Sequence, residues 1–552
     1  MLDAGPPVRP HCCPSGPSSC RRFRQGSRRP VYQRWTTPLL IGDPGDHRKG
    51  TVMDTAPAQP SPDALHRRFW RQFGLVLAEL PAGMWLEVAE ASATRDPGGP
   101  VARCHVVQAP EDRGYREALA SGLTTLAPPP LDAFEPGYVY EKDVLICHDE
   151  EGRDMLRRLV PGVEEDVARS REPSARTVMR LTAEPGTGGS RVLDALRSLP
   201  EGAPVAPNYL VSICNVNLCP ADEPRIPRSA RPVPAVSTDA YAGLGTSVVV
   251  IDTGLVVDWD REDHLEAYPW LRDRSGQVDG RLEGRVAGEL RGRPDDGVIH
   301  EYVGHGTFVT GVVRCVAPEA RVRTYNRLQW AGTMDAAEFG HRLLDALADY
   351  EDRNGAWPDV ISLSAGVRPL PGESLGSLDE FMEELHRRER TVLVAAAGND
   401  ASTAPFYPAA YARHDPSVIA VGALDATQSR RAVYSDHGPW VSVYARGSFL
   451  VNAFAFGSYT PLHPDDEIFE EKPEDEDGYD GPGDGLFHGL ARWSGTSFAT
   501  PLVSGLIAAR MSAAGESSGE AARWLLDRAD AQAVRGRDGR PLPRLFVDQE
   551  VR

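Results

Sequence analysis

The chain has 552 residues, with 79 Asp and Glu against 60 Lys and Arg, which gives a formal net charge of -19. A single hydrophobic core rarely serves this length, so we expect one large domain and at least one smaller one. The acidic balance argues against a nucleic-acid partner, because phosphate contacts require clustered Lys and Arg. The sequence has no apolar run long enough for a bilayer and no signal-peptide pattern, so we expect no membrane partner and a cytoplasmic location.

The N-terminal part of the chain falls into two segments of different composition. Residues 1–58 are rich in Pro, Gly, Ser and Arg, which predicts a disordered leader. An over-extended translation start, with Met53 as the true first residue, explains this composition, and a basic tail that binds nucleic acid is the alternative. Residues 59–137 are expected to form an accessory region, in which Leu65–Leu80 has an amphipathic pattern.

The segment 138–215 has the alternating pattern of a small α+β domain. We expect strands at Tyr140–Cys147, Arg176–Thr182 and Val205–Ser212, and helices at Glu151–Leu159 and Ser190–Leu199. Residues 216–237 follow, with five prolines. Proline lacks a backbone donor and favours extended conformation, so we interpret this stretch as a linker.

Residues 238–552 have the pattern of a parallel sheet covered by helices, and therefore of a large α/β domain. The expected strands are Ser247–Ile251, Val322–Tyr325, Val360–Ser364, Val392–Ala396 and Val418–Ala423. The expected helices are Met334–Tyr350 and Leu378–Arg388. An acidic insertion covers about residues 452–490, and its charge run is expected to be disordered by self-repulsion.

Two reactive side chains occur where an α/β sheet usually presents functional groups. The apolar run 248–251 ends in Asp252, which places this carboxylate at the end of a buried strand. A helix cap or a nucleotide ligand is the alternative for such an Asp. His305 has glycine on both sides and precedes an apolar helix, so its imidazole should be accessible, although a lone His there is more often structural.

The third reactive side chain is Ser497, in the segment Ser494-Gly495-Thr496-Ser497. The apolar run Leu502–Ala509 follows it, which predicts a buried helix with Ser497 in the first turn. In a first turn the backbone N–H has no intrahelical partner and the dipole favours negative charge, so an oxyanion beside the nucleophile would be stabilised. An ordinary Ser/Thr cap is the alternative for this segment alone.

Together these three segments resemble the subtilisin family of serine proteases, in which the catalytic triad has the chain order Asp, His, Ser. A fourth segment, Val394–Asp400, is similar to the strand and turn that carry the family's oxyanion-binding Asn. The resemblance spans roughly Val236–Ala531. It implies a three-layer α/β domain with a mostly parallel central sheet, preceded by a smaller α+β N-terminal region.

The resemblance also implies a serine endopeptidase that acts on protein or peptide substrates. Its catalytic triad would be Asp252, His305 and Ser497, and the oxyanion would accept hydrogen bonds from the Asn399 amide and the Ser497 N–H. No metal or organic cofactor takes part in this chemistry. Members of the family often bind structural calcium, but none of their ligand positions can be assigned here.

The expected substrate-binding residues also follow from the resemblance. Val360–Gly366 is similar to the edge strand that pairs with the substrate backbone, so Ser364, Ala365 and Gly366 should form one wall of the S1 pocket. Phe406 aligns near the floor of that pocket, where a member that accepts large P1 side chains has a small residue. A shallow S1 pocket is the resulting hypothesis.

The segment 138–215 occupies the place of the family's N-terminal propeptide. We expect it to restrain the enzyme, and a regulatory partner would act on this N-terminal region. The main alternative is a catalytically silent scaffold or binding protein on the same fold. The related sedolisin group is disfavoured by the segment around His305, and an α/β-hydrolase is excluded because the Gly-x-Ser-x-Gly elbow is missing around Ser497.

Overall fold

A computed structural model describes residues 62–546, apart from 97–101, 121–125, 127–135, 171–176, 183–188, 214–220, 285–297, 300–301, 329–331, 374, 460–484 and 537–538. The expected disordered leader, Met53 and the acidic run 460–484 lie outside the described residues. All described residues belong to one compact unit. Its larger part, from residue 221 onward, is called the catalytic domain below, and residues 62–213 are called the N-terminal region.

The N-terminal region is built on an antiparallel sheet with the strand order β10-β6-β3-β1-β2, in which β5 also pairs with β3 and β4 with β5. The strands of this sheet are β1 (Trp85–Glu90), β2 (Cys104–Gln108), β3 (Pro136–Cys147), β4 (Val163–Glu165), β5 (Thr177–Leu181), β6 (Val205–Ser212) and, contributed by the catalytic domain, β10 (Thr333–Asp335). Its helices are α1 (Pro62–Glu79), α2 (Arg113–Ala120), α3 (Glu150–Leu159) and α4 (Arg191–Arg197). The strands and helices predicted between residues 138 and 215 are therefore all present.

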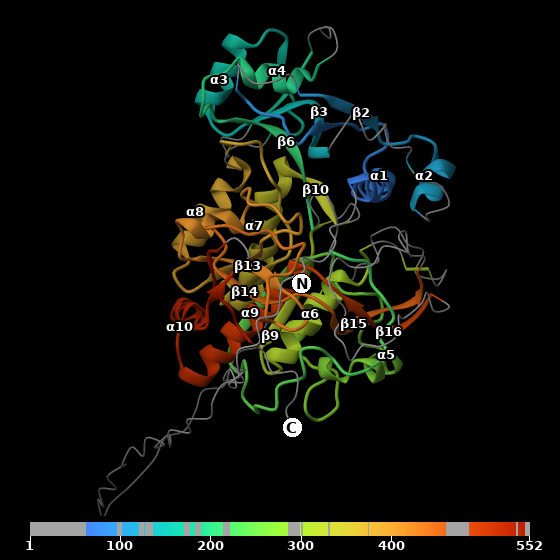
Figure 1. Ribbon diagram of the computed structural model, residues 1–552, viewed down its shortest axis with the longest axis vertical. Coiled ribbons are helices and arrows are strands. Elements are labelled where there is room, and N and C mark those ends of the chain that lie inside the picture. Colours follow the sequence, from blue (N-terminus) through green and yellow to red (C-terminus); the bar gives the residue numbers. More distant parts are fainter. Residues whose placement is uncertain are drawn as a thin grey trace, which may run out of the picture. The chain divides into compact units, whose positions relative to one another are not determined.

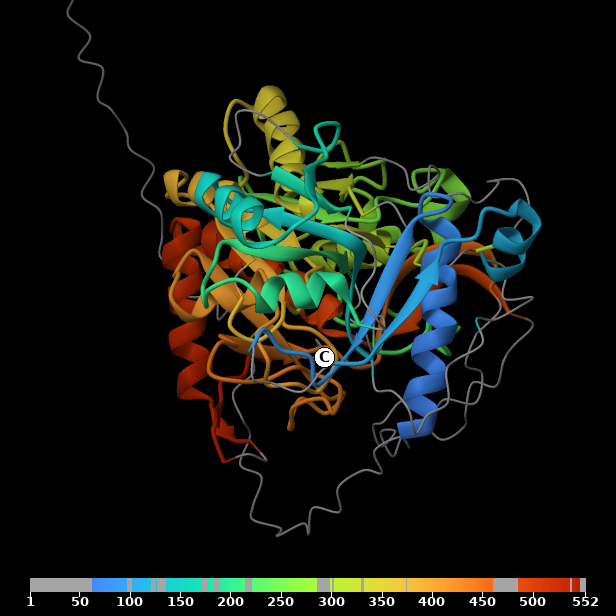
Figure 2. The same ribbon diagram turned by 90° about the horizontal axis from the view of Figure 1, so that it is seen from above.

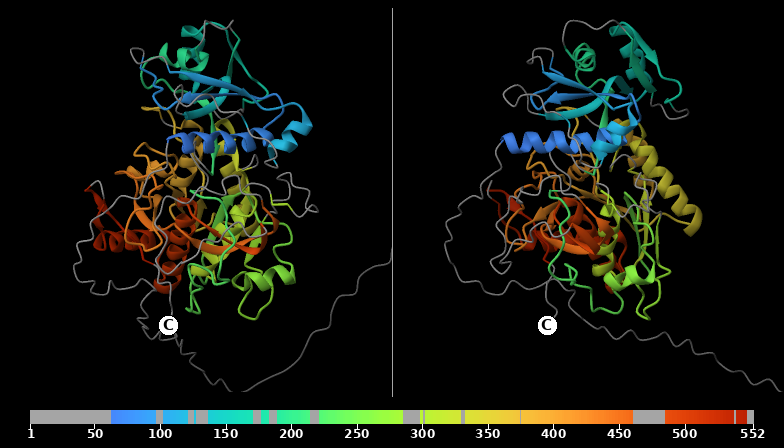
Figure 3. Two further views of the ribbon diagram at one scale, coloured as in Figure 1. Left: turned by 45° about the vertical axis from the view of Figure 1, so that its right-hand side comes forward. Right: turned by 90° about the vertical axis from the view of Figure 1, so that its right-hand side faces the viewer.

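Helix α1 and strand β1 join the expected accessory region to the propeptide-like segment. Strand β1 pairs with β3 in antiparallel register, Val88 lying opposite Val139. Helix α1 buries Trp70, Phe73 and Leu77, at the spacing of an amphipathic helix. Figures 2 and 3 show α1 beside this sheet. The two segments therefore share one sheet and one core.

The catalytic domain contains a fully parallel sheet with the order β14-β13-β12-β11-β7-β9-β8. Its strands are β7 (Ser247–Asp252), β8 (Leu282–Gly284), β9 (Arg321–Asn326), β11 (Val360–Leu363), β12 (Val392–Ala396), β13 (Val418–Leu424) and β14 (Val443–Arg446). Both faces of this sheet are covered, which explains why its central strands are continuous apolar runs.

Helices α6 (His305–Val316) and α9 (Thr496–Ala514) pack on one face of this sheet. On the other face, Phe339 and Leu343 of α7 (Ala336–Asn354) share a hydrophobic core with alternate strand residues such as Ile361. Helix α8 (Asp379–Arg387) packs beside α7, and α10 (Ser518–Ala531) packs on α9 (Figure 1). The expected three-layer α/β architecture is confirmed.

The remaining elements of the catalytic domain are short or lie outside the main sheet. They are α5 (Glu262–Ala267), the 3-10 turns η2 (Pro269–Leu271), η4 (Gly376–Leu378) and η5 (Ala409–Arg413), and strands β15 (Leu450–Ser458), β16 (Leu486–Trp493), β17 (Val534–Arg535) and β18 (Pro541–Leu542). Strands β15 and β16 form an antiparallel pair, so both arms of the expected acidic insertion are ordered. Among the described helices, none combines the length and apolarity that crossing a bilayer requires.

Two expectations are wrong, one about where a helix begins and one about where a strand lies in the sheet. Helix α7 begins at Ala336 and not at Met334, because Thr333–Asp335 is strand β10, which pairs with β6 of the N-terminal region. The stretch from Val360 was expected to be an edge strand, but β11 lies between β7 and β12. Only the residues that follow β11 offer a free edge, and Gly366 uses it to pair with Ser212.

From residue 221 onward, the proline-rich stretch is packed against the β15–β16 pair. Arg225 and Arg492 exchange two backbone hydrogen bonds, of 2.9 and 2.7 Å, and Val233 bridges to Val451. The indole of Trp493 donates a hydrogen bond of 2.6 Å to the carbonyl of Asp222. The described part of this stretch, from residue 221, is therefore attached to the catalytic domain.

Candidate active site

Asp252 and His305 meet where strand β7 ends and helix α6 begins. The Nδ1 atom of His305 lies 2.8 Å from Oδ1 of Asp252, and this Oδ1 also accepts a hydrogen bond of 2.7 Å from the Thr253 backbone N–H. Both side chains are fully buried. A carboxylate at Nδ1 fixes the tautomer of the ring, so Nε2 is the nitrogen that can accept a proton.

The glycine that follows His305 has a packing role. A Cβ atom at Gly306 would lie 2.3 Å from the carbonyl oxygen of Gly254 and 3.2 Å from Oδ1 of Asp252. The first turn of α6 therefore approaches the end of β7 more closely than any other residue type allows. The expectation that the flanking glycines keep the imidazole accessible is wrong, because His305 is fully buried.

Ser497 is the second residue of helix α9 and lies beside the end of strand β11. The hydroxyl of Ser364 donates a hydrogen bond of 2.9 Å to the backbone carbonyl of Ser497. Ser497 is 1% exposed. Within the described residues, Oγ of Ser497 and Nε2 of His305 are buried and have no hydrogen-bond partner. The two atoms are therefore not hydrogen-bonded to each other in this structure.

Aromatic rings surround the imidazole of His305. Trp493 meets it edge to face, with ring centroids 5.5 Å apart, and Phe498 lies at 5.3 Å. Phe308 packs against Phe498 at 4.4 Å. These rings exclude water from one side of the Asp252–His305 pair, which strengthens its electrostatic interaction.

Asn399 follows strand β12 and is held by the residue that precedes Ser497. Its side-chain oxygen accepts two hydrogen bonds from Thr496, one from the backbone N–H and one from the hydroxyl, both of 2.9 Å. The same hydroxyl accepts a hydrogen bond of 3.2 Å from the Gly398 N–H. Because the amide oxygen is used in this way, the amide nitrogen is the end of Asn399 that can donate to a ligand.

The predicted substrate-binding residues also lie at this end of the sheet. Gly366 exchanges two backbone hydrogen bonds with Ser212, of 3.0 and 2.9 Å. Phe406 is 2% exposed, and its ring lies so close to Gly366 that a Cβ atom there would be 2.6 Å from it. Ala365 is buried. All eight residues that the sequence singled out are therefore found around the ends of β7, β11 and β12.

The sequence pattern that defines the subtilase family matches residues 243–540, which is more than half of the chain. The chain belongs to the subtilase family. This is a family of serine endopeptidases, and the match covers the whole region that contains Asp252, His305, Asn399 and Ser497. The fold class expected from the sequence and the family are thereby confirmed.

Several curated subtilases are similar to this chain. They include thermitase of Thermoactinomyces vulgaris, which is 29% identical over 236 residues, covering 41% of this chain and 71% of the relative. Proteinase R of Parengyodontium album is 24% identical over 348 residues, covering 62% and 73%. A thermophilic serine proteinase of Bacillus sp. (strain AK1) is 27% identical over 274 residues, covering 48% of this chain. The chain spans about half of that last relative, 51%.

Sequence reasoning did not find all residues of this subtilase site. Thr496 was noted only as part of a segment, although it fixes the Asn399 amide. Trp493 and the ion pair of Arg368 with the buried Asp436 were not noted at all, because single charged or aromatic residues carry no spacing signal. In the residues that the structure describes, no group of three or more His, Cys, Asp or Glu side chains could hold a metal ion.

Proposed function

We propose that this subtilase hydrolyses peptide bonds with Asp252, His305 and Ser497 as its catalytic triad, and that its N-terminal region restrains it. The 2.8 Å contact between His305 Nδ1 and Asp252 Oδ1 carries the first part of the proposal. It leaves Nε2 as the base in a buried site, and Ser497 stands in the first turn of helix α9, immediately before Phe498, whose ring centroid lies 5.3 Å from that of His305.

In the proposed reaction, Ser497 Oγ attacks the carbonyl carbon of the scissile peptide bond while His305 Nε2 takes the hydroxyl proton. The tetrahedral oxyanion accepts hydrogen bonds from the Asn399 amide nitrogen and the Ser497 backbone N–H. His305 then gives its proton to the leaving amine, which leaves an acyl-enzyme. Water, deprotonated by His305, hydrolyses this ester and restores Ser497. Asp252 stabilises the imidazolium at both stages, and no metal or organic cofactor is needed.

Two separate backbone contacts support the proposed restraint. Ser212, the last residue of β6, pairs with Gly366 in antiparallel register, and the next residue, Ile213, donates a hydrogen bond of 3.0 Å to the carbonyl of Gly332. Strand β6 itself pairs with β10. The end of the N-terminal region therefore occupies the free backbone edge that a peptide substrate would use in β-augmentation.

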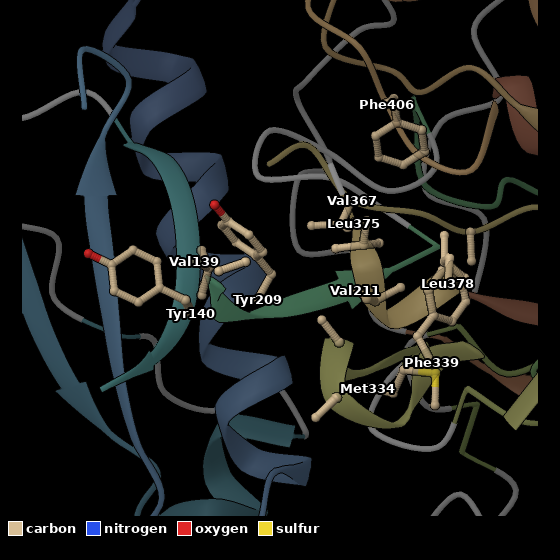
Figure 4. Close-up of a cluster of buried hydrophobic side chains, with 14 of the residues drawn as sticks. Val139, Tyr140, Tyr209, Val211, Met334, Phe339, Val367, Leu375, Leu378 and Phe406 are labelled. Carbon is tan, nitrogen blue, oxygen red and sulfur yellow. The ribbon is translucent and has the colours of Figure 1, made fainter. Parts of the chain in front are cut away.

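Side-chain packing also supports the restraint, because the hydrophobic core continues from the N-terminal region into the catalytic domain. Val211 of β6 is fully buried and belongs to one cluster with Phe339 and Leu378 (Figure 4). Asn208 of β6 accepts a hydrogen bond of 2.9 Å from the Ala337 N–H, at the start of helix α7. A helix start whose N–H groups are unsatisfied is destabilised, so the N-terminal region stabilises α7 when it is bound.

The test is labelling of the full chain by a fluorophosphonate, with Ser497→Ala as the matched control. We expect labelling of the wild type that increases after mild proteolysis of the N-terminal region, and none of Ser497→Ala. The absence of Ser497-dependent labelling even after proteolysis would establish the alternative of a catalytically silent scaffold. Equal Ser497-dependent labelling before and after proteolysis would contradict the proposed restraint but not the proposed catalysis.

Mass spectrometry of the N-terminus distinguishes a retained from a removed N-terminal region. A new terminus between about Ile213 and Ser237 in the wild type, missing in Ser497→Ala, would identify a propeptide that the enzyme removes itself. An intact chain in both proteins would identify a permanent regulatory region. In that case a regulatory partner that displaces β6 from Gly366 would be the activator.

The cytoplasmic location is part of the same proposal. The described cysteines Cys104, Cys147 and Cys315 are free thiols, which agrees with a reducing compartment. Fractionation of cells that express the full chain tests it, and recovery of the protein outside the cytoplasm would contradict it. Protein or peptide substrates are the only partners that the proposed reaction requires.

A further inference from the structure

The turn that carries Asn399 is held by a buried carboxylate from a distant loop. Oδ1 of Asp436 accepts hydrogen bonds from the backbone N–H groups of Asp400, at 3.0 Å, and Ser402, at 2.7 Å. The backbone N–H of Asp436 donates a hydrogen bond of 2.9 Å to the carbonyl of Gly398. Asp436 therefore binds the chain immediately before and immediately after Asn399.

The close contact between Asp436 and this turn requires a glycine at position 398. Gly398 has φ +105, and a Cβ atom there would lie 2.5 Å from Oδ2 of Asp436. The carboxylate of Asp436 thus packs directly against Gly398. The positive φ of Gly398 is one that other residues rarely adopt. A change at Asp436 would be transmitted to the neighbouring Asn399 by these contacts.

Arg368 supplies the positive charge that this buried carboxylate requires. One of its terminal nitrogens lies 2.9 Å from Oδ2 of Asp400 and 3.0 Å from Oδ2 of Asp436. The side chain of Asp436 is fully buried and that of Asp400 is 1% exposed. Because an unpaired buried charge is very costly, the guanidinium and the two carboxylates stabilise this geometry as a unit.

The orientation of the Asn399 side chain depends on a fixed backbone at this turn. Thr496 fixes the amide oxygen, but the direction of the amide nitrogen also depends on the backbone that carries the side chain. An oxyanion donor contributes fully only when it is preorganised, and small displacements weaken it steeply.

We propose that Asp436 is a positioning residue, which together with Arg368 holds the turn around Asn399 so that the amide nitrogen points at the reacting carbonyl. The proposal rests on the proposed role of Asn399 in the reaction. Asp436 touches neither the substrate nor the catalytic triad and acts only through the turn. Its loss should therefore lower kcat and leave KM nearly unchanged, because the oxyanion exists only after attack.

Ionisation of Asp436 supplies a second signature. Burial, together with the neighbouring Asp400, raises the pKa of Asp436 to about 8, although Arg368 and the two backbone N–H donors lower it. Tyr138 of the N-terminal region is the other titratable group that interacts with Arg368. The ionised carboxylate accepts the hydrogen bonds from the Asp400 and Ser402 N–H groups and pairs with Arg368, so kcat should rise as the pH passes through about 8.

The experiment is a double-mutant cycle on the full chain with a small peptide substrate. Above pH 8, where Asp436 is ionised, we expect Asp436→Asn, which retains an acceptor oxygen, to lower kcat roughly 10-fold and KM to change less than about twofold. In the Asn399→Ala background the same substitution should change kcat less than about twofold, because the donor that it positions is missing. The step in kcat near pH 8 should disappear in Asp436→Asn.

Asp279→Asn is the matched control, because Asp279 is also a buried carboxylate of the catalytic domain that pairs with arginines, Arg281 and Arg314. It should lower thermal stability and leave kcat unchanged. Equal losses of kcat for Asp279→Asn and Asp436→Asn, or equal effects of Asp436→Asn with and without Asn399, would overturn the positioning role. Labelling that persists in Ser497→Ala would instead overturn the proposed function.

Discussion

The hydroxyl of Tyr209, in strand β6 of the N-terminal region, donates a hydrogen bond to the carboxylate of Glu373 in the catalytic domain. The same hydroxyl accepts a hydrogen bond of 2.9 Å from the Leu370 N–H, and Arg95 lies 3.3 Å from the other oxygen of Glu373. Tyr209, Leu370 and Glu373 are buried at this contact between the two parts of the chain. The contact is therefore a place where pH can act on the proposed restraint.

The first prediction concerns the pH dependence of the restraint. Burial raises the pKa of Glu373 to about 7 from an ordinary 4.5, although the hydrogen bond from Tyr209 and the charge of Arg95 lower it. When the N-terminal region dissociates, the carboxylate regains water and its pKa falls. The bound state therefore holds the proton more tightly, so the restraint is fully present below pH 4.5 and weakens as the pH rises through 7.

Fluorophosphonate labelling of Ser497 between pH 5 and 8 measures this effect. The rate should rise roughly 10- to 100-fold more in the wild type than in Glu373→Gln, which is neutral at every pH. Both proteins have the same residues at the proposed catalytic site, so the ratio of their rates isolates Glu373. Identical pH profiles in the two proteins would show that this contact does not sense pH.

The second prediction concerns the apolar contact of strand β6. Val211→Asp should raise the labelling rate of the full chain at least about 10-fold, because a carboxylate in the pocket around Phe339 and Leu378 costs several kcal/mol and weakens docking. Val167→Asp places the same charge in the N-terminal region at a position that is 75% exposed, and should have no effect. Equal activation by both substitutions would contradict a specific contact.

The third prediction concerns the size of the S1 pocket. Phe406→Ala should raise kcat/KM for peptides with Phe or Leu at P1 by roughly 10- to 100-fold, since the ring fills the space beside Gly366. Peptides with Ala at P1 should be cleaved within about threefold of the wild-type rate. A wild-type enzyme that already prefers Phe or Leu to Ala would refute the shallow pocket.

The fourth prediction concerns the oxyanion donor. Asn399→Ala should lower kcat about 10²- to 10³-fold with little change in KM, because the lost hydrogen bond forms only with the tetrahedral intermediate. Asn354→Ala is a suitable control, since Asn354 lies at the end of helix α7 and bonds to Tyr350 and Arg321 on the surface. A comparable loss of kcat in that control would point to a general effect on folding.

The fifth prediction concerns the orientation of the His305 imidazole. Asp252→Asn preserves the shape of the side chain but changes the preferred tautomer of His305, so kcat should fall about 10⁴-fold near neutral pH. Retained binding of a peptide inhibitor would show that the site is still folded. A loss of less than tenfold would mean that Asp252 does not orient the ring.

The sequence predicted the catalytic domain well because its signals are local. A run of four apolar residues before Asp252 specifies a buried strand with a carboxylate at its end, whatever lies around it. Ser497 before a long apolar run likewise specifies a helix start. Both positions are correct in the structure, and so are the strands and helices of the N-terminal region, whose patterns are equally short.

Relationships between distant segments could not be predicted in the same way. Met334 has a helical pattern, but β6 recruits it into a sheet. Asp436 and Arg368 are 68 positions apart, and Tyr209 and Glu373 are 164 apart. No periodicity connects residues at such separations, because their contact depends on how complete elements pack.

The sequence by itself thus determined the chemistry available to this subtilase: the parallel sheet, the order Asp252, His305 and Ser497, and the segment with Asn399. Only the tertiary structure decided what surrounds that chemistry. It brought the end of β6 onto the free edge at Gly366 and enclosed the turn around Asn399 with Asp436. Local runs encode elements, whereas burial and charge pairing between elements exist only once the chain has folded.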